Sequence, residues 1–218
     1  MDLAARSMRT EEFNSSRRAT AAYDYDGSVI VLASQSPRRA EILGNAGIFF
    51  LVRAANIDEQ RRTEESGEEY ARRMAREKAE ATPIQPGEIV LGADTVVCVD
   101  GHVLGKPRDA EDAKRMLTLL SGRWHEVITA ICIRGSGPAI VDSSRTRVHF
   151  VSLSPSEIEQ YIASGEPFDK AGAYAIQGLA SKYIDRIEGC YFNVVGLPVS
   201  LVFRHLKGFP CGQSSPSR

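Results

Sequence analysis

The sequence lacks an excess of either charge, so it offers no broad electrostatic surface for a polyanion. Its 218 residues carry 27 Lys and Arg against 28 Asp and Glu, a formal net charge of −1. Long nucleic acid is bound mainly through an extended positive field, and this balance excludes such a field. A site for a small anion must therefore be a local cluster of cationic side chains.

Cysteines are few, and long apolar runs are missing. No CxxC pair and no zinc-like Cys/His spacing occurs among Cys98, Cys132, Cys190 and Cys211. This pattern favours buried free thiols in a reducing compartment. No apolar run approaches the roughly 20 residues that cross a bilayer, and the first 26 residues hold no apolar segment typical of a secretory signal. We expect a cytoplasmic protein that does not associate with membranes.

Three common signatures of nucleotide enzymes and hydrolases are also missing. The chain has no GxxxxGK[ST] phosphate loop and no GxSxG nucleophile elbow. Residues 135–137 read GSG, but they lack the third glycine and the strand-to-helix setting of a dinucleotide-binding fingerprint. The histidines are scattered along the chain, and we interpret each as structural: His102, His125, His149 and His205.

Turn and capping signals divide the chain from about residue 28 into alternating strands and helices. Capping boxes predict helices that begin at Ser66 and Ser154, and Asp100-Gly101 predicts a two-residue hairpin turn. Further helices are predicted from Pro37, over 109–120 and over 198–206. Strands are expected over 28–33, 88–99, 102–104, 124–133, 140–153 and 183–187, with a loop over 166–178. This mix predicts an α/β fold with a long mixed sheet over residues 27–210. We interpret residues 1–26 as a disordered extension and 211–218 as a flexible tail.

The segment that follows the first strand combines hydroxyl groups and arginines at a helix N-terminus. Ser34, Ser36, Arg38 and Arg39 surround Pro37, a favourable first helical residue. Backbone N–H groups, helix dipole and cationic side chains together favour an anion such as phosphate at this point. The alternative is an ordinary helix cap with two solvated arginines.

Asp94 interrupts an apolar strand, which is costly unless the carboxylate faces a partner, a metal or a cleft. The alternative is a carboxylate in water at the sheet edge. The hairpin turn returns Lys106 towards Thr95, where it either forms a salt bridge or contacts phosphate. Lys78 shares a helix face with Tyr70, so its stem is expected to be packed.

Gln177 follows a glycine-containing polar segment, and its amide offers one donor and one acceptor group. It therefore either reads the edge of a nucleobase or serves as a structural loop amide.

These motifs, in this order, resemble the Maf family over about residues 29–206. The text that carries the resemblance is LASQSPRR (32–39), IDE (57–59), AREKA (75–79), GADTVV (92–97), GKP (105–107), LSG (120–122), DKAGAY and IQG (169–178), and NVVGLP (193–198). Each piece is modest by itself, and the combination is highly specific.

The resemblance implies a two-lobed α/β fold related to the inosine triphosphate pyrophosphatases, with the active site in a cleft. It implies cleavage of nucleoside triphosphates to the monophosphate and pyrophosphate, with a divalent cation such as Mg²⁺ or Mn²⁺. Homodimers are common in the family. Asp94 matches the proton acceptor that activates water, and Glu59 matches a second acidic position that holds metal with Asp94.

The resemblance also assigns two further groups of residues. The positions that contact phosphate are Ser36, Arg39, Lys78 and Lys106, and those that tune base choice are Arg38, Thr95 and Gln177. The loop text is similar to the branch that hydrolyses dTTP and UTP, whereas the branch acting on 7-methyl-GTP differs there. Two carboxylates and several cations, without a His or Cys nucleophile, fit direct attack by water. The alternatives are a non-catalytic regulator of cell division (septum formation) and a sibling pyrophosphatase for 7-methyl-GTP or purine nucleotides.

Overall fold

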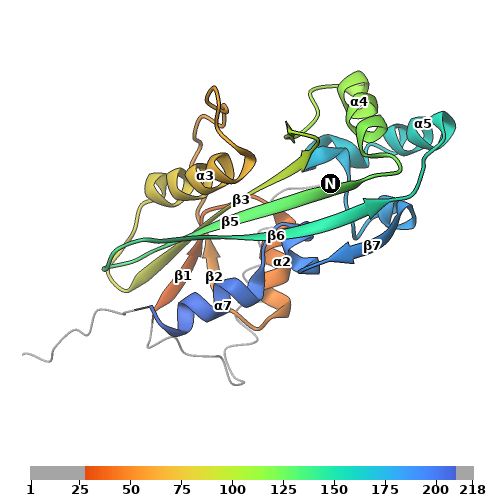
Figure 1. Ribbon diagram of the computed structural model, residues 1–218. Helices are drawn as coiled ribbons and strands as arrows, with labels where there is room; N and C mark the ends of the chain where they lie inside the picture. Colours follow the sequence, from red (N-terminus) through yellow and green to blue (C-terminus); the bar gives the residue numbers. More distant parts are fainter. Residues whose placement is uncertain (1–27, 210–218) are drawn as a thin grey trace, which may run out of the picture.

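The computed structural model describes residues 28–209, and a seven-stranded mixed sheet organises them (Figure 1). The sheet has the order β2-β1-β3-β5-β6-β7, with β4 paired to β3. The strands are β1 (Val29–Leu32), β2 (Phe50–Val52), β3 (Glu88–Val99), β4 (His102–Leu104), β5 (Trp124–Arg134), β6 (Ile140–Phe150) and β7 (Ile184–Glu188). The predictions for residues 1–26 and 211–218 lie outside the described residues.

Strand β3 has two different partners along one edge, and between them part of this edge is unpaired. β1 runs parallel to β3 and pairs with it as far as Leu91, whereas β4 is antiparallel and pairs from Val97 onwards. Along its other edge β3 pairs continuously with β5 from Val90 to Cys98. Within residues 28–209, positions 92–96 therefore have no strand neighbour on the edge that β1 and β4 share. Such a switch point is where open α/β sheets bind ligands.

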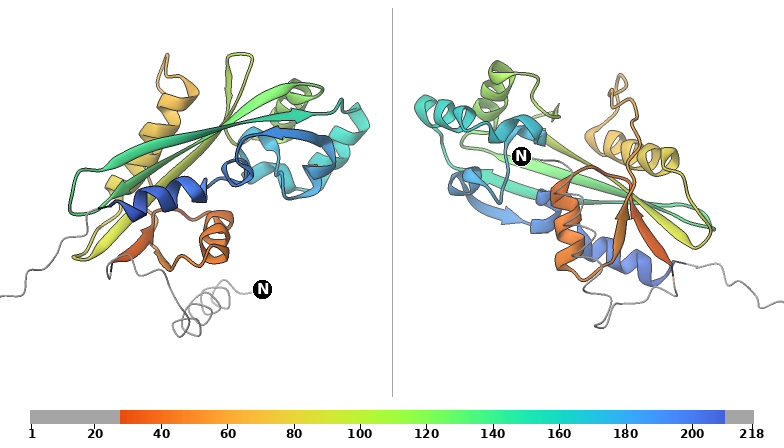
Figure 2. Two further views of the ribbon diagram at one scale, coloured as in Figure 1. Left: turned by 60° about the horizontal axis from the view of Figure 1, so that its bottom comes forward. Right: turned by 180° about the vertical axis from the view of Figure 1, so that it is seen from behind.

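The helices cover both faces of the sheet (Figure 2). The α-helices are α2 (Pro37–Asn45), α3 (Gly67–Ala81), α4 (Ala110–Leu120), α5 (Pro155–Ala163), α6 (Tyr191–Val195) and α7 (Val199–Lys207). Alternation along β3 separates the faces: Val96 packs in the cluster with α3, whereas Val97 packs in the cluster with α4 and α5. The side chains of Ala93 and Ile89 pack in a third cluster, with α2 and α7.

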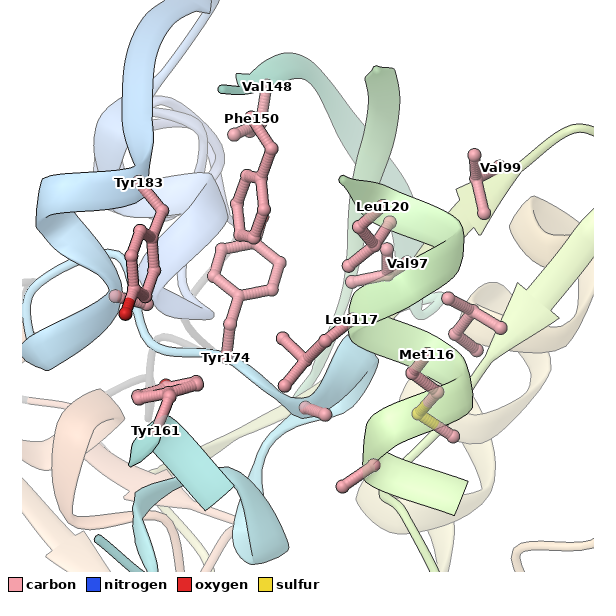
Figure 3. Packing of buried hydrophobic residues seen from close by; sticks show 14 of the residues in the cluster. Val97, Val99, Met116, Leu117, Leu120, Val148, Phe150, Tyr161, Tyr174 and Tyr183 are labelled. Atoms are coloured by element: carbon pink, nitrogen blue, oxygen red, sulfur yellow. The ribbon is translucent and has the colours of Figure 1, made fainter. Parts of the chain in front are cut away.

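Two lobes follow from these clusters. One surrounds β1 and β2 with α2, α3 and α7, and the other joins α4 and α5 to the far ends of the long strands. The core of the second lobe includes a group of aromatic rings, from Phe150, Tyr161, Tyr174 and Tyr183 (Figure 3). Strands β3 and β5 supply side chains to both lobes, so these two strands run from one lobe into the other.

The local predictions hold in most segments. Both capping boxes are present, at Ser66 and Ser154, and the hairpin pairs Val99 with His102. The predicted mixed α/β fold is confirmed. Among the described residues, no helix is long and apolar enough to cross a membrane.

The differences are short elements. The segment 166–178, predicted as a loop, contains two 3-10 turns, Glu166–Asp169 and Ala171–Ala173, and a third covers Leu179–Tyr183. Strand β6 ends at Phe150 rather than at residue 153. The patterns also missed β2 and α6, which are three and five residues long, respectively. Elements this short have too few residues for a recognisable period.

Candidate active site

A cleft of about 580 Å³ lies at the open edge of β3. Its walls come from the loop before α2, the loop between β2 and α3, the residues after β4, and the segment 169–177. All of the residues predicted for the site line this cleft: Ser36, Arg38, Arg39, Glu59, Lys78, Asp94, Thr95, Lys106 and Gln177. The tertiary structure therefore brings together side chains from most of the chain.

Asp94 and Lys78 form a nearly buried ion pair at the base of the cleft. Lys78 donates from Nζ to Asp94 Oδ1 at 2.6 Å, and Glu59 Oε1 lies 2.9 Å from the same Nζ. Close packing of α3 on β3 makes this pair possible, because a Cβ at Gly92 would lie 2.2 Å from the carbonyl oxygen of Ala75. The glycine thus allows the helix to approach until its lysine reaches the carboxylate of the strand.

The environments of the two carboxylates differ. Burial raises the pKa of Asp94 above its ordinary value, although the charges of Lys78 and Arg39 oppose the shift. Partial burial also acts to raise the pKa of Glu59, but the hydrogen bond and charge of Lys78 outweigh it and lower that pKa. The two groups are thus separated in basicity, and Asp94 is the better proton acceptor.

Asp94 retains one oxygen directed to the cleft. Its Oδ2 atom makes no hydrogen bond to a described residue, yet it is not among the fully buried unpaired polar atoms. Because Asp94 also lines the cleft, this oxygen is accessible to a water molecule. The geometry suits a group that accepts a proton from water.

Tyr70 anchors the loop that carries Glu59, and the sequence interpretation did not assign it to the site. Its Oη donates to the carbonyl oxygen of Glu59 at 2.5 Å. Burial, followed by the charges of Asp94 and Glu59, raises the pKa of Tyr70 to about 12. Its position two turns before Lys78 on the same helix face was the signal that could have identified it.

The N-terminus of α2 presents an unused hydroxyl group. Ser36 is the N-cap residue, but its side chain makes no capping hydrogen bond. Ser34 instead binds locally: its Oγ accepts from the Ser36 N–H at 3.2 Å and from Arg39 Nη1 at 3.0 Å. The Ser36 hydroxyl is therefore available to an anion, in line with the predicted phosphate cradle.

Arg39 is buried and acts mainly within the protein. Its Nε donates to the carbonyl oxygen of Gly196 at 2.8 Å, and Nη1 donates to that of Ala93 at 2.9 Å as well as to Ser34. Its Nη2 donates to Thr95 Oγ1 at 3.2 Å. Four of the five guanidinium N–H groups are thus engaged, which leaves one for substrate. Burial lowers the pKa of Arg39.

Thr95 belongs to a buried polar network beneath the cleft. Its hydroxyl lies 2.9 Å from Thr129 Oγ1. Asn193 completes the network: its Oδ1 accepts from the Thr129 N–H at 3.1 Å, and its Nδ2 donates to the Val127 carbonyl oxygen at 2.9 Å. The segment around α6 is thereby fixed to the sheet next to Arg39.

Arg38 connects the two lobes across the cleft. Its Nη1 donates to Asp169 Oδ2 at 3.0 Å, and Lys170 pairs with the other oxygen of that carboxylate. Burial acts to raise the pKa of Asp169, but the hydrogen bonds from Lys170 and Arg38 hold it below its ordinary value. This ion pair was not predicted, since residues 38 and 169 are distant in the sequence.

Two of the predicted residues make no side-chain hydrogen bond or salt bridge to a described residue, although the charge of Lys106 helps to lower the pKa of Glu59. Lys106 and Gln177 are exposed, and neither side chain makes a hydrogen bond to the described part of the chain. Their polar groups are free to contact a bound molecule.

The cleft as a whole is locally positive in a nearly neutral chain. Its lining holds five cationic side chains and three carboxylates, namely Arg38, Arg39, Lys78, Lys106 and Lys170 against Glu59, Asp94 and Asp169. This is the local cluster that the balanced composition requires of an anion-binding protein.

The carboxylates of Glu59 and Asp94 were predicted to hold a divalent cation. Both lie within 3 Å of one cationic atom, Lys78 Nζ, so they converge on a single position. Among residues 28–209 there is no group of three or more His, Cys, Asp or Glu side chains suited to a metal. Two oxygen ligands from the protein match the way Mg²⁺ is held together with substrate phosphates.

A family comparison supports the resemblance noted in the sequence. The model of Maf-like proteins matches residues 29–209, which is most of the chain. The chain belongs to the Maf family. All the motifs quoted above lie within the matched range.

Several curated Maf relatives share about half of their residues with this chain. A dTTP/UTP pyrophosphatase of Koribacter versatilis is 48% identical over 182 residues, covering 83% of this chain and 94% of the relative. One from Syntrophomonas wolfei is 53% identical over 176 residues, covering 79% and 93%, respectively. One from Chromobacterium violaceum is 51% identical over 179 residues, covering 78% and 89%.

Proposed function

We propose that this chain is a nucleoside triphosphate pyrophosphatase that hydrolyses dTTP and UTP to the monophosphate and pyrophosphate. The observation that carries the proposal is the buried Asp94 carboxylate, which faces a cleft lined by five cationic residues. The curated relatives at 48–53% identity, all with the name dTTP/UTP pyrophosphatase, support the same activity.

Asp94 acts as the base in this proposal. Its accessible Oδ2 accepts a hydrogen bond from water and then the proton, as water attacks a phosphorus atom of the substrate. The raised pKa strengthens it as a proton acceptor. Lys78 keeps the carboxylate oriented through the bond to Oδ1. Charge that develops on the leaving pyrophosphate is stabilised by fixed cations, which is the main route to catalysis of such reactions.

The phosphate chain lies along the cationic side of the cleft. The Ser36 hydroxyl, the last N–H of Arg39 and the ammonium of Lys106 contact its oxygens, because these groups make no hydrogen bond to residues 28–209. Glu59 and Asp94 would hold a divalent cation, Mg²⁺ or Mn²⁺, which would supply positive charge against the developing negative charge of the phosphate chain.

Base choice depends on residues 169–177, which form another wall of the cleft. Gln177 reads the donor and acceptor edge of uracil or thymine with its amide, while Arg38 and Thr95 limit the space around it. A base with a different edge leaves polar groups unpaired, which costs on the order of 1–3 kcal/mol per group.

Two other functions are less favoured. A non-catalytic regulator of cell division has no need for a buried carboxylate in a cleft that is lined by several cationic side chains. A sibling enzyme for 7-methyl-GTP or other purines would use the same chemistry. The relatives cited above favour dTTP and UTP instead, because they carry the name dTTP/UTP pyrophosphatase. A homodimer and a cytoplasmic location stay predictions.

The test is a substrate panel with controlled metal. Pyrophosphate release is measured from UTP, dTTP, CTP, GTP and 7-methyl-GTP after EDTA treatment, and again with added Mg²⁺ or Mn²⁺. We expect UTP and dTTP to have the highest kcat/KM, and we expect EDTA to abolish turnover. Activity that is highest with 7-methyl-GTP, or release of single phosphates instead of pyrophosphate, would contradict the proposal.

A further inference from the structure

The segment that presents Gln177 is fixed by hydrogen bonds on both sides of that residue. Before it, the Ala175 N–H donates to Tyr161 Oη at 3.2 Å. After it, the Leu179 N–H donates to Glu166 at 3.0 Å (Oε1) and 3.1 Å (Oε2). Tyr161 Oη in turn donates to Glu166 Oε1 at 2.8 Å, so one pair of side chains holds both anchors.

The pair is itself rigidly supported. Tyr161 is 3% exposed in the aromatic core of the second lobe, where its ring packs edge-on against Tyr183 with centroids 6.1 Å apart (Figure 3). The backbone of Glu166 is tied at both of its polar groups, since its N–H donates to Ser164 Oγ and its carbonyl accepts from Lys170 Nζ. Neither partner can shift without disturbing α5 or the cleft wall.

Gly178 shows how closely the Glu166 carboxylate approaches the segment. A Cβ at residue 178 would lie 2.3 Å from Glu166 Oε2, a distance that real Cβ atoms do not adopt. The carboxylate therefore occupies the space beside the backbone directly after Gln177. The Gly178 N–H also closes a turn onto the carbonyl oxygen of Ala175 at 3.0 Å.

Among residues 28–209, no group forms a hydrogen bond that would fix the amide of Gln177. Its side chain is exposed in the cleft and makes no hydrogen bond to a described residue. The backbone from Ala175 to Leu179 sets the point from which this side chain enters the cleft, so a shift of that backbone also shifts its amide. Discrimination between bases requires polar groups held to within a fraction of an ångström, so the backbone anchors bear directly on specificity.

We infer that Tyr161 and Glu166 are positioning residues for base specificity, which act by holding the segment that carries Gln177. The inference rests on the base-reading role proposed for Gln177. Neither residue lines the cleft, so neither contacts substrate. Their removal should alter the choice of base while leaving recognition of the phosphate chain intact.

The first experiment compares two tyrosines of one aromatic cluster. Tyr161→Phe removes the hydroxyl that accepts from Ala175, whereas Tyr183→Phe removes a hydroxyl that donates to the Glu157 carbonyl oxygen at 3.4 Å, away from the segment. Both tyrosines are 3% exposed, so each variant removes one hydroxyl group from an equally buried ring. We measure kcat/KM for UTP and CTP, inhibition by inorganic pyrophosphate, and the thermal midpoint.

Tyr161→Phe is expected to lower the ratio of kcat/KM for UTP over CTP by roughly two- to tenfold, because the hydroxyl group that bonds both Ala175 and Glu166 is lost. Inhibition by pyrophosphate should not change, and Tyr183→Phe should keep the wild-type ratio. An unchanged ratio in Tyr161→Phe, or an equal fall in Tyr183→Phe, would overturn the inference.

The second experiment uses Glu166 and a double-mutant cycle. Glu166→Ala should lower the same ratio, and Glu166→Gln should restore most of it, because one amide oxygen still accepts from the Leu179 N–H. In a Gln177→Ala background, Tyr161→Phe should cause no further loss, since the anchored group is already gone. Additive losses in the double variant would show that Tyr161 acts by another route.

The two proposals fail in different ways. If the wild-type protein does not prefer UTP over CTP, or if Gln177→Ala leaves the ratio unchanged, the base-reading role of Gln177 is wrong. If Gln177→Ala lowers the ratio and Tyr161→Phe does not, the base-reading role stands and the positioning role is wrong.

Discussion

Replacement of Asp94 by Asn should separate the contribution of this carboxylate to activity from its contribution to stability. Asn is nearly isosteric with the neutral acid, and Lys78 keeps its contact with Glu59 at 2.9 Å in the variant. Loss of a general base typically lowers turnover by about 10²–10⁴. We therefore expect an almost inactive protein that folds normally.

The stability of this variant follows from the direction in which the pKa of Asp94 moves. Burial raises that pKa in the folded protein, so the native state binds the proton more tightly than the unfolded chain does. The contribution of the carboxyl group to stability is then fully present below its unfolded pKa of about 3.9 and is lost as the pH rises through the folded value. At neutral pH, every tenfold difference in proton affinity between the two states destabilises the fold by about 1.4 kcal/mol.

Asn cannot ionise and does not carry this penalty. The free energy of unfolding of Asp94→Asn at pH 7, from urea titration in EDTA, should equal or exceed that of the wild-type protein. The difference in unfolding free energy between the two proteins should vanish as the pH falls below about 4, because Asp94 is then protonated in both the folded and the unfolded state. A variant that is clearly less stable at pH 7 would mean that the ion pair with Lys78 stabilises the fold, and wild-type turnover would refute the role as base.

Three other substitutions test residues in and beside the cleft. Lys106→Met should leave the thermal midpoint unchanged, because this exposed ammonium makes no hydrogen bond or salt bridge to a described residue. It should lower kcat/KM for UTP by roughly tenfold or more, since one charged hydrogen bond to phosphate is lost; a normal kcat/KM would exclude the contact. Arg39→Lys should lower the free energy of unfolding in urea by roughly 2–4 kcal/mol, since Lys cannot reproduce the four N–H contacts. An unchanged urea midpoint would show that these four hydrogen bonds are not needed for stability. Gly92→Ala should cost about 1–3 kcal/mol and also lower kcat, because the new methyl group meets the Ala75 carbonyl and displaces α3 with Lys78; full activity would mean that the Lys78–Asp94 contact tolerates this movement.

Local signals in the sequence were sufficient for most of the fold. Serine and glutamate three residues apart mark both capping boxes because the bonds involved lie within one helical turn. The hairpin register followed from Asp100-Gly101 alone, since a two-residue turn aligns Val99 with His102. Strand β2 was missed because three residues show no period, and its place is decided by pairing with β1.

Motifs indicated which residues line the cleft, but not which groups those residues contact. Ser36 was predicted as part of the cradle, yet Ser34 makes the local bonds and leaves Ser36 unused. Arg39 was assigned to phosphate, and most of its donors bind protein. These outcomes depend on which groups approach one another after folding, and such distances do not appear in local sequence.

What the sequence determined by itself is the alternation of elements, the need for a local anion site in a neutral chain, and the chemical types gathered there. A lone carboxylate in an apolar strand already indicated a cleft, because burial of a bare charge is costly. Only the tertiary structure decided that β3 changes partner between Leu91 and Val97, and that Lys78 reaches Asp94 past a glycine. It also decided that Tyr161 and Glu166 anchor the segment with Gln177. Each of these is a contact between distant parts of the chain, and packing rather than local propensity sets it.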